Sequence, residues 1–279
     1  SSNYPARRPF SSPLSFTEMR LSMREQAYQK LPHERLDIYR VYLKVASLCA
    51  DIVAEAPCPV VALDHLDRAM ESIGVNLMRG NEQPAGSPAR ANYLDVAIGS
   101  THECAASLDI CLARCVTDES AHRAATQKLW RIRGMLLGLK RASISRSVRE
   151  EQAPYGTSKF PFAVLNMYQV SLDGVRWIQQ FFEELAPETR TQRKLDTSTT
   201  GTALNIAEGH GRETIADQNR FMKMAQEHAY QTLLMLDLMA ARHEAAYSRI
   251  SEGKATQERV ITMLYAWCQR NVKRSDRQP

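Results

Sequence analysis

The side chains with the greatest capacity for chemistry are the cysteine thiols and histidine imidazoles. Their spacing indicates whether they could bind a metal ion together. Cys104, Cys111 and Cys115 share one face of a helix, and His102 is the one further ligand nearby. The chain has neither a CxxC pair nor the paired Glu-x-x-His motifs that hold two irons inside a helical bundle. We therefore expect no metal and no cofactor, with the cysteines as small buried thiols in a reducing compartment.

Sequence motifs of catalysis are missing as well. The chain contains none of GxxxxGK[ST], GxGxxG, GxSxG or HExxH. Most of the histidines fall at scattered helical phases, and His210 stands between two glycines, where we expect it to be exposed to solvent. The sequence therefore predicts a protein that is not an enzyme.

Positive charge is concentrated in two segments. The chain as a whole carries a net charge of +5, whereas residues 123–149 hold eight basic residues and no acidic one. Residues 254–279 hold six basic residues against two acidic ones. RNA or DNA is the natural partner of such segments, because each neutralised phosphate releases counterions. The residues that we expect to contact nucleic acid are Arg123, Lys128, Arg131, Arg133, Lys140, Arg141, Arg146, Arg149, Arg259, Arg270, Lys273 and Arg274.

An internal repeat relates the two halves of the chain. Residues 36–43 (LDIYRVYL) and 165–172 (LNMYQVSL) agree at four of eight positions, at an offset of 129 residues. A one-residue deletion later in the alignment changes the offset to 128. With this single change, the match extends over about a hundred positions. A match of this length in one register indicates a tandem duplication. Further identical pairs are Leu66/Leu195, Asp67/Asp196, Asn76/Asn205, Gly80/Gly209, Ala97/Ala225, Leu108/Leu236, Asp109/Asp237, Ala113/Ala241, Arg114/Arg242, Arg131/Arg259, Met135/Met263 and Leu136/Leu264.

The apolar residues of each copy recur at helical spacing, in steps of three and four from Leu36 to Val53. Proline, glycine and capping residues divide each copy into four helices. In the first copy Ser87-Pro88 has the types of an N-cap and first helical residue, and Gly80 suits a left-handed cap at the end of the second helix. In the second copy Thr214 and Asp217 have the outline of a capping box.

These elements predict an all-α fold of two tandem antiparallel four-helix bundles related by the repeat. We expect residues 1–30 to form a flexible tail, residues 31–149 the diverged bundle, 150–162 the linker and 163–279 the second bundle. No apolar run is long enough for a transmembrane helix. No secretory signal is visible, so we expect a cytoplasmic protein.

The turn that closes the second helix of the second copy reads Asn-Ile-Ala-Glu-Gly-His-Gly-Arg over residues 205–212. Helix-end chemistry explains its residue types, because glycine adopts backbone angles forbidden to other residues and the polar side chains can bind free backbone groups or one another. The residues given this structural role are Asn205, Glu208, Gly209, Gly211 and Arg212, with Asn76 and Gly80 in the first copy.

Residues 205–212 also resemble the signature of a bacterial four-helix-bundle family. That family is named after proteins encoded by ribosomal intervening sequences and includes the accessory variability protein of diversity-generating retroelements. The second copy matches the family's "NIAEGxGR" turn throughout, with Thr214 where the family usually has serine, whereas the first copy keeps only Asn76 and Gly80. Relatives carry arginines just after the position of Leu195, where this chain has Asp196 and Thr197.

The resemblance implies a non-enzymatic accessory protein that assists a reverse-transcriptase-type partner. Together with the basic segments it predicts binding of RNA or DNA through the fourth helix of each copy. The alternative is a structural or oligomerisation scaffold that binds other proteins and no nucleic acid. It draws on the wide apolar face of the first helices and on four methionines between residues 222 and 239. Since each chain supplies two bundles, we expect a monomer or a small homo-oligomer of whole chains.

Overall fold

A computed structural model describes residues 32–57, 60–144, 160–185 and 190–275 of the chain. Throughout these ranges the regular structure is helical and no strand occurs, in agreement with the expected all-α class. The N-terminal tail expected over residues 1–30 lies outside the described ranges. The elements are η1 (Pro32–Arg35), α2 (Asp37–Glu55), α3 (Val61–Glu82), α4 (Pro88–Ala113), α5 (Glu119–Ile144), η2 (Pro161–Val164), α6 (Asn166–Glu183), α7 (Arg190–His210), α8 (Ile215–Ala241) and α9 (Tyr247–Ser275).

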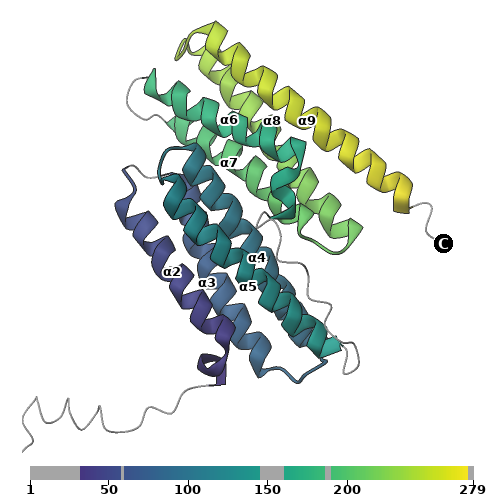
Figure 1. Cartoon of the computed structure of the whole chain (residues 1–279). Coiled ribbons are helices and arrows are strands. Elements are labelled where there is room, and N and C mark those ends of the chain that lie inside the picture. The colour runs from purple at the N-terminus through teal and green to yellow at the C-terminus, as the bar shows by residue number, and fades with distance from the viewer. Residues whose placement is uncertain (1–31, 58–59, 145–159, 186–189, 276–279) are drawn as a thin grey trace, which may run out of the picture.

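The α-helices lie in two groups, α2–α5 and α6–α9 (Figure 1). In the first group α3 packs on α4, α4 on α5, α5 on α2 and α2 on α3. The second group has the same order of neighbours, with α6 to α9 in place of α2 to α5. Helix α4 of the first group also contacts α6 and α7 of the second, so α4 joins the groups. Within the described ranges, no helix has the length and apolar character required to cross a bilayer.

Two helix starts that the sequence predicts are present. The Ser87 side chain accepts a hydrogen bond from the backbone N–H of Arg90 at 3.2 Å, and Pro88 is the first residue of α4. The Thr214 side chain accepts from the backbone N–H of Asp217 at 3.1 Å and begins α8. Each cap satisfies one of the backbone donors left free at the start of a helix.

Positions related by the repeat share unusual backbone geometry. A short 3-10 helix precedes each group, and the residue that follows it, Leu36 or Leu165, has φ −76° and ψ 130° or φ −73° and ψ 126°. Helices α4 and α8 are each followed closely by a left-handed residue, Cys115 with φ 54° and His243 with φ 55°. This left-handed conformation is rare outside glycine. Its recurrence at two positions 128 residues apart therefore indicates that the two helix groups share backbone structure at this point.

The paired asparagines repeat a side-chain contact as well. Asn76 Nδ2 donates to the backbone oxygen of Ser72 at 2.8 Å, and Asn205 Nδ2 donates to the backbone oxygen of Gly201 at 2.7 Å. Both bonds return one turn along the same helix. They satisfy an amide that would otherwise be buried without a partner.

One hydrophobic core extends through both groups, with a smaller cluster at one end of the second. Its centre is α4, which buries residues on every side of the helix because it packs on its own group and on α6 and α7. Small residues make this possible, since two neighbours can approach a helix that carries Gly99, Ala105 and Ala106. The small apolar and polar side chains of α4 therefore reflect its double burial.

Two of the expected boundaries are wrong in detail. Phe160 and Phe162, placed in the linker over residues 150–162, are buried in the core, while residues 150–159 lie outside the described ranges. Gly80 is not a left-handed cap, because α3 continues to Glu82 and Gly80 does not have a positive φ. An aromatic-rich segment that enters a core is part of the fold, whatever its sequence position between repeats.

Candidate nucleic-acid interface and the joint between the helix groups

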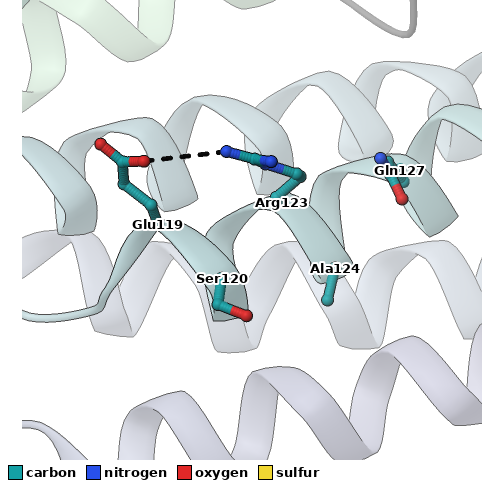
Figure 2. Close-up of a pocket in the computed structure, with 5 residues that line it drawn as sticks. All are labelled: Glu119, Ser120, Arg123, Ala124 and Gln127. Atoms are coloured by element: carbon teal, nitrogen blue, oxygen red, sulfur yellow. Dashed lines mark ion pairs between the residues drawn. The ribbon is translucent and has the colours of Figure 1, made fainter.

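The basic residues of α5 fall into two kinds, exposed and internal. Lys128 is half-buried and Arg131 and Arg141 are exposed, and none of the three forms an ion pair with a described residue. Arg123 is exposed too and pairs with Glu119 at 3.7 Å, one turn away. Figure 2 shows this pair with Ser120, Ala124 and Gln127, which line the same open pocket. The pocket has a volume of about 370 Å³. An exposed pair of this kind contributes little to stability and leaves the arginine available to a phosphate.

Lys140 is internal. It is 8% exposed, and its Nζ donates to Asp95 of α4 at 2.6 Å and to Glu213 of the α7–α8 connection. Burial alone would lower the pKa of Lys140, but the two carboxylate hydrogen bonds outweigh it and raise the pKa above its usual value. Both its charge and its donors are therefore used inside the protein, between the two helix groups.

Arg133 is also turned inward. Its Nε donates to His102 Nε2 at 2.8 Å, and its guanidinium lies 5.1 Å from the centre of the Trp130 ring. Burial lowers the pKa of this arginine. The structure thus gives Arg133 and Lys140 internal partners, whereas Arg131 and Arg141 on the same helix face solvent.

The remaining predicted cations belong to α9 or lie outside the described ranges. Arg259 and Arg270 are exposed on α9 and form no ion pair with a described residue. The expected residues Arg146 and Arg149 lie outside the described ranges, and the side chains of Lys273 and Arg274 are not described either. Among the predicted residues that the structure describes, the exposed cations are thus Arg123, Arg131 and Arg141 on α5, with Arg259 and Arg270 on α9.

His102 lies at the contact between the groups and is 2% exposed. The rings of Phe160 and Phe162 meet it edge-on, at centroid distances of 5.5 and 5.8 Å. Burial, with Arg133 as the next cause, lowers the pKa of His102 to about 3, so the imidazole is neutral at physiological pH. Nε2 accepts from Arg133, which places the ring proton on Nδ1, an atom without a partner in the described structure.

The segment 205–212 packs against His102 and does not form an exposed turn. Residues 205–210 are the last turns of α7, and Gly211 follows directly. A Cβ on Gly211 would lie 1.8 Å from His102 Nδ1, and one on Gly209 would lie 2.9 Å from the Cβ of Phe221. Neither glycine has a positive φ, so close approach explains these glycines and the expected special backbone angles do not.

The other polar residues of this segment meet the expectation in part. Arg212 pairs with Glu208, as expected, and its guanidinium lies 4.6 Å from the centre of the Phe221 ring. The same guanidinium packs against Gly99 of α4. The Arg212–Glu208 pair therefore lies at the contact of α4 with α6 and α7, which we call the joint between the groups. His210, expected in solvent, is half-buried with its ring centroid 6.1 Å from that of Trp267, and burial lowers its pKa.

An ion pair between the groups was not predicted from the sequence. Arg114 Nη1 donates to Asp196 Oδ1 at 2.9 Å, and the side chains are only 6% and 12% exposed. Arg114 Nε donates to Gln179 Oε1 at 2.9 Å. Asp196 Oδ2 also accepts from the backbone N–H of Val61 at 3.4 Å, at the start of α3. Asp196 thus contacts the first group through both of its carboxylate oxygens, and it holds the two groups together.

A second polar contact between the groups is centred on Asp109 of α4. The Tyr168 hydroxyl donates to Asp109 Oδ2 at 3.0 Å, and His122 Nε2 lies 2.7 Å from Oδ1. Burial and Asp109 together raise the pKa of Tyr168 well above its usual value. Tyrosine and aspartate recur at the matching positions of the repeat, as Tyr39 and Asp237, but that recurrence does not show which of the two pairs meets.

The cysteines and histidines do not gather into one site in the part of the chain that the structure describes. Among the described residues, no three His, Cys, Asp or Glu side chains gather as metal ligands would. Cys49, Cys104 and Cys111 are buried, and burial raises the pKa of each thiol, whereas Cys115 is exposed. Comparison of the chain with protein-family models, curated proteins and solved structures finds no significant match.

Proposed function

We propose that the chain is a tandem pair of four-helix bundles that acts as a non-enzymatic accessory protein in the cytoplasm. The arrangement is supported by the shared order of helix neighbours in α2–α5 and α6–α9. It is also supported by the matching 3-10 helices and by the left-handed Cys115 and His243. Local geometry of this kind recurs when the same supersecondary unit is used twice.

The protein binds RNA or DNA through exposed cations of α5 and α9. The observation that carries this proposal is that Arg131 and Arg141 have no ion-pair partner among the described residues, in a helix whose one acidic residue is Glu119 at its first position. Guanidinium groups presented to solvent suit phosphate, because they can form two parallel, charge-assisted hydrogen bonds to its oxygens. Arg259 is the repeat-related counterpart of Arg131 and is exposed as well.

The polymerase-type partner rests on the resemblance at residues 205–212. We propose that the protein assists a reverse transcriptase by holding nucleic acid beside it. A reverse-transcriptase gene adjacent to the gene of this protein would support that partner, and association of the two purified proteins would test it. A partner of this kind needs no catalytic group from the chain itself.

The nucleic-acid proposal is tested by salt-titrated binding of a structured RNA, measured by fluorescence anisotropy. Replacing Arg131 and Arg141 by Glu is expected to weaken binding at least tenfold at low salt. It should also reduce the salt slope by about two, one for each phosphate that is no longer neutralised. Lys140 is left unchanged in this variant because reversing its charge would break two internal ion pairs.

A matched control makes the same change of net charge elsewhere. Arg176 of α6 and Lys194 of α7 are exposed, and their replacement by Glu is expected to alter affinity by less than about threefold. If the wild-type protein does not bind the RNA at low salt, or binds it without a salt dependence, the nucleic-acid function is ruled out.

The alternative, a scaffold for protein partners, is favoured by exposed apolar side chains on α8. Tyr230 and Leu234 are 53% and 54% exposed on one face of that helix, and Met224 is 39% exposed. Under this alternative the Arg131→Glu, Arg141→Glu variant keeps full activity in the cell. Loss of activity in the same variant favours nucleic acid.

A further inference from the structure

At the joint, a surface of the first helix group packs against a different surface of the second group. Because the two groups are related by the repeat, each group contains a counterpart of both surfaces. One face is on α4, which presents Arg114 and Asp109. The other is on α6 and α7, which present Tyr168 and Asp196. In the repeat, α8 corresponds to α4, and α2 and α3 correspond to α6 and α7. An interface between unlike faces of related units leaves one copy of each face unused.

The two unused faces, one on α8 and the other on α2 and α3, contain the same types of polar residue as the joint. Arg242 corresponds to Arg114 and Asp67 to Asp196, and both Arg242 and Asp67 are exposed. Asp237 corresponds to Asp109 and is exposed as well, while Tyr39, the counterpart of Tyr168, is half-buried. In the joint these positions supply the Arg114–Asp196 ion pair and the hydrogen bond from Tyr168 to Asp109. The residues for a second ion pair and a second tyrosine–aspartate hydrogen bond are therefore present in the chain, but within one molecule they do not meet.

Two of these residues take part in surface ion pairs within the molecule. Asp237 pairs with Lys254 at 2.6 Å, and Arg242 pairs with Glu244 at 3.7 Å and donates from Nη1 to Thr191 Oγ1 at 3.0 Å. The side chains of Asp237 and Arg242 are each still more than half exposed. Surface pairs of this kind contribute at most about 1 kcal/mol. They therefore leave both side chains able to meet a partner that covers the face.

The apolar residues of the unused faces follow the same pattern. Leu43 and Val75 are 50% and 41% exposed, whereas their counterparts Leu172 and Leu204 are buried in the core that the two groups share. Tyr230 and Leu234 on α8 are exposed, whereas their counterparts on α4, His102 and Ala106, are 2% and 0% exposed. Four of the large exposed apolar side chains thus have repeat-related counterparts that are buried where the two groups meet.

We infer that these faces bind a second copy of the chain, head to tail. The α8 face of one molecule packs on the α2 and α3 face of the next, with Arg242 opposite Asp67 of the neighbouring molecule and Asp237 opposite Tyr39. The proposed contact covers the apolar residues Leu43, Val75, Tyr230 and Leu234, which are exposed on the single molecule. Opposite charges on the two faces favour this alignment over the pairing of two like faces.

Light scattering across a range of protein concentrations, coupled to size exclusion, tests the assembly. The wild-type mass is expected to rise with concentration above the 31.5 kDa of one chain. Asp67→Arg and Arg242→Asp place like charges opposite each other, and each is expected to weaken association at least tenfold. Because both residues are exposed, each variant should keep the wild-type circular dichroism spectrum, and a melting temperature close to that of the wild type at concentrations where the wild type is monomeric.

Mixing the two variants gives the decisive measurement. In an equimolar mixture the aspartate introduced at position 242 of one chain meets the arginine introduced at position 67 of the other. At the next contact the native Arg242 and Asp67 meet, so association is expected to return to near the wild-type strength. Asp51→Arg on α2 is the control, because its counterpart Gln180 is exposed and lies outside the joint. A wild-type protein that stays at 31.5 kDa at every concentration, or a mixture no more associated than its separate components, would overturn the inference.

Discussion

Replacement of Asp196 by Ala is expected to lower the free energy of unfolding by about 3–5 kcal/mol, because it leaves a buried guanidinium without its carboxylate. Arg114 is 6% exposed, and Gln179 can accept from one of its nitrogens but cannot balance its charge. The substitution also removes the side-chain acceptor of the Val61 N–H. Urea denaturation followed by circular dichroism measures the change.

The repeat supplies the control for this prediction. Asp67 occupies the matching position on α3 but is exposed, so Asp67→Ala is expected to change the free energy of unfolding by less than about 1 kcal/mol. Replacing Arg114 by Met and Asp196 by Leu together should recover more than half of the loss, since no charge is then left buried. Equal losses for Asp67→Ala and Asp196→Ala at low protein concentration would contradict the joint described above.

Replacement of Gly211 by Ala is expected to lower the free energy of unfolding by about 3 kcal/mol, because the new methyl group would overlap the His102 ring. The Cβ would lie 1.8 Å from His102 Nδ1. The ring has little room to withdraw, since Arg133 donates to its other nitrogen and Phe160 and Phe162 pack against it. Thermal and chemical denaturation both report the loss.

Gly134 of α5 gives a control of opposite sign. A Cβ at this helical position meets no atom within 4 Å, so Gly134→Ala is expected to stabilise the protein by about 0.5–1 kcal/mol. His102→Ala opens space for the methyl group, so the two substitutions Gly211→Ala and His102→Ala should together cost less than the sum of their separate costs. Strict additivity of the two would show that the residues do not meet.

The helical class and the helix starts could be predicted from the sequence because they depend on local chemistry. Ser87-Pro88 and Thr214 have the residue types of helix caps, and these caps form as expected. Apolar spacing likewise identified the stretches that became helices. Such signals arise within a few residues and do not require knowledge of what packs on the helix.

The joint could not be predicted, because helical periodicity does not say which neighbour covers a face. Asp196 and Arg114 were visible as identities between the repeats, yet nothing local indicated that one pair meets while Asp67 and Arg242 remain exposed. The glycines of residues 205–212 were misinterpreted for the same reason. Their role is to admit His102 and Phe221, and these contacts are tertiary.

Net charge over a segment also overstated the size of the candidate interface. The basic run of residues 123–149 includes Lys140, whose partners Asp95 and Glu213 are distant in sequence. It includes Arg133 as well, which donates to His102. A charge count takes no account of partners supplied by other helices, so it identifies a basic helix but not which of its cations are exposed.

Helix α4 joins both helix groups into a single core, and the fold, the joint and the proposed assembly all depend on this. Native-state hydrogen exchange resolved by mass spectrometry tests it directly on the amides of residues 94–111 in α4 and 195–207 in α7. We expect both segments to exchange with the same opening free energy, equal to that of global unfolding. If one helix group loses its protection at a lower free energy while the other stays closed, the two groups are independent and the single core is wrong.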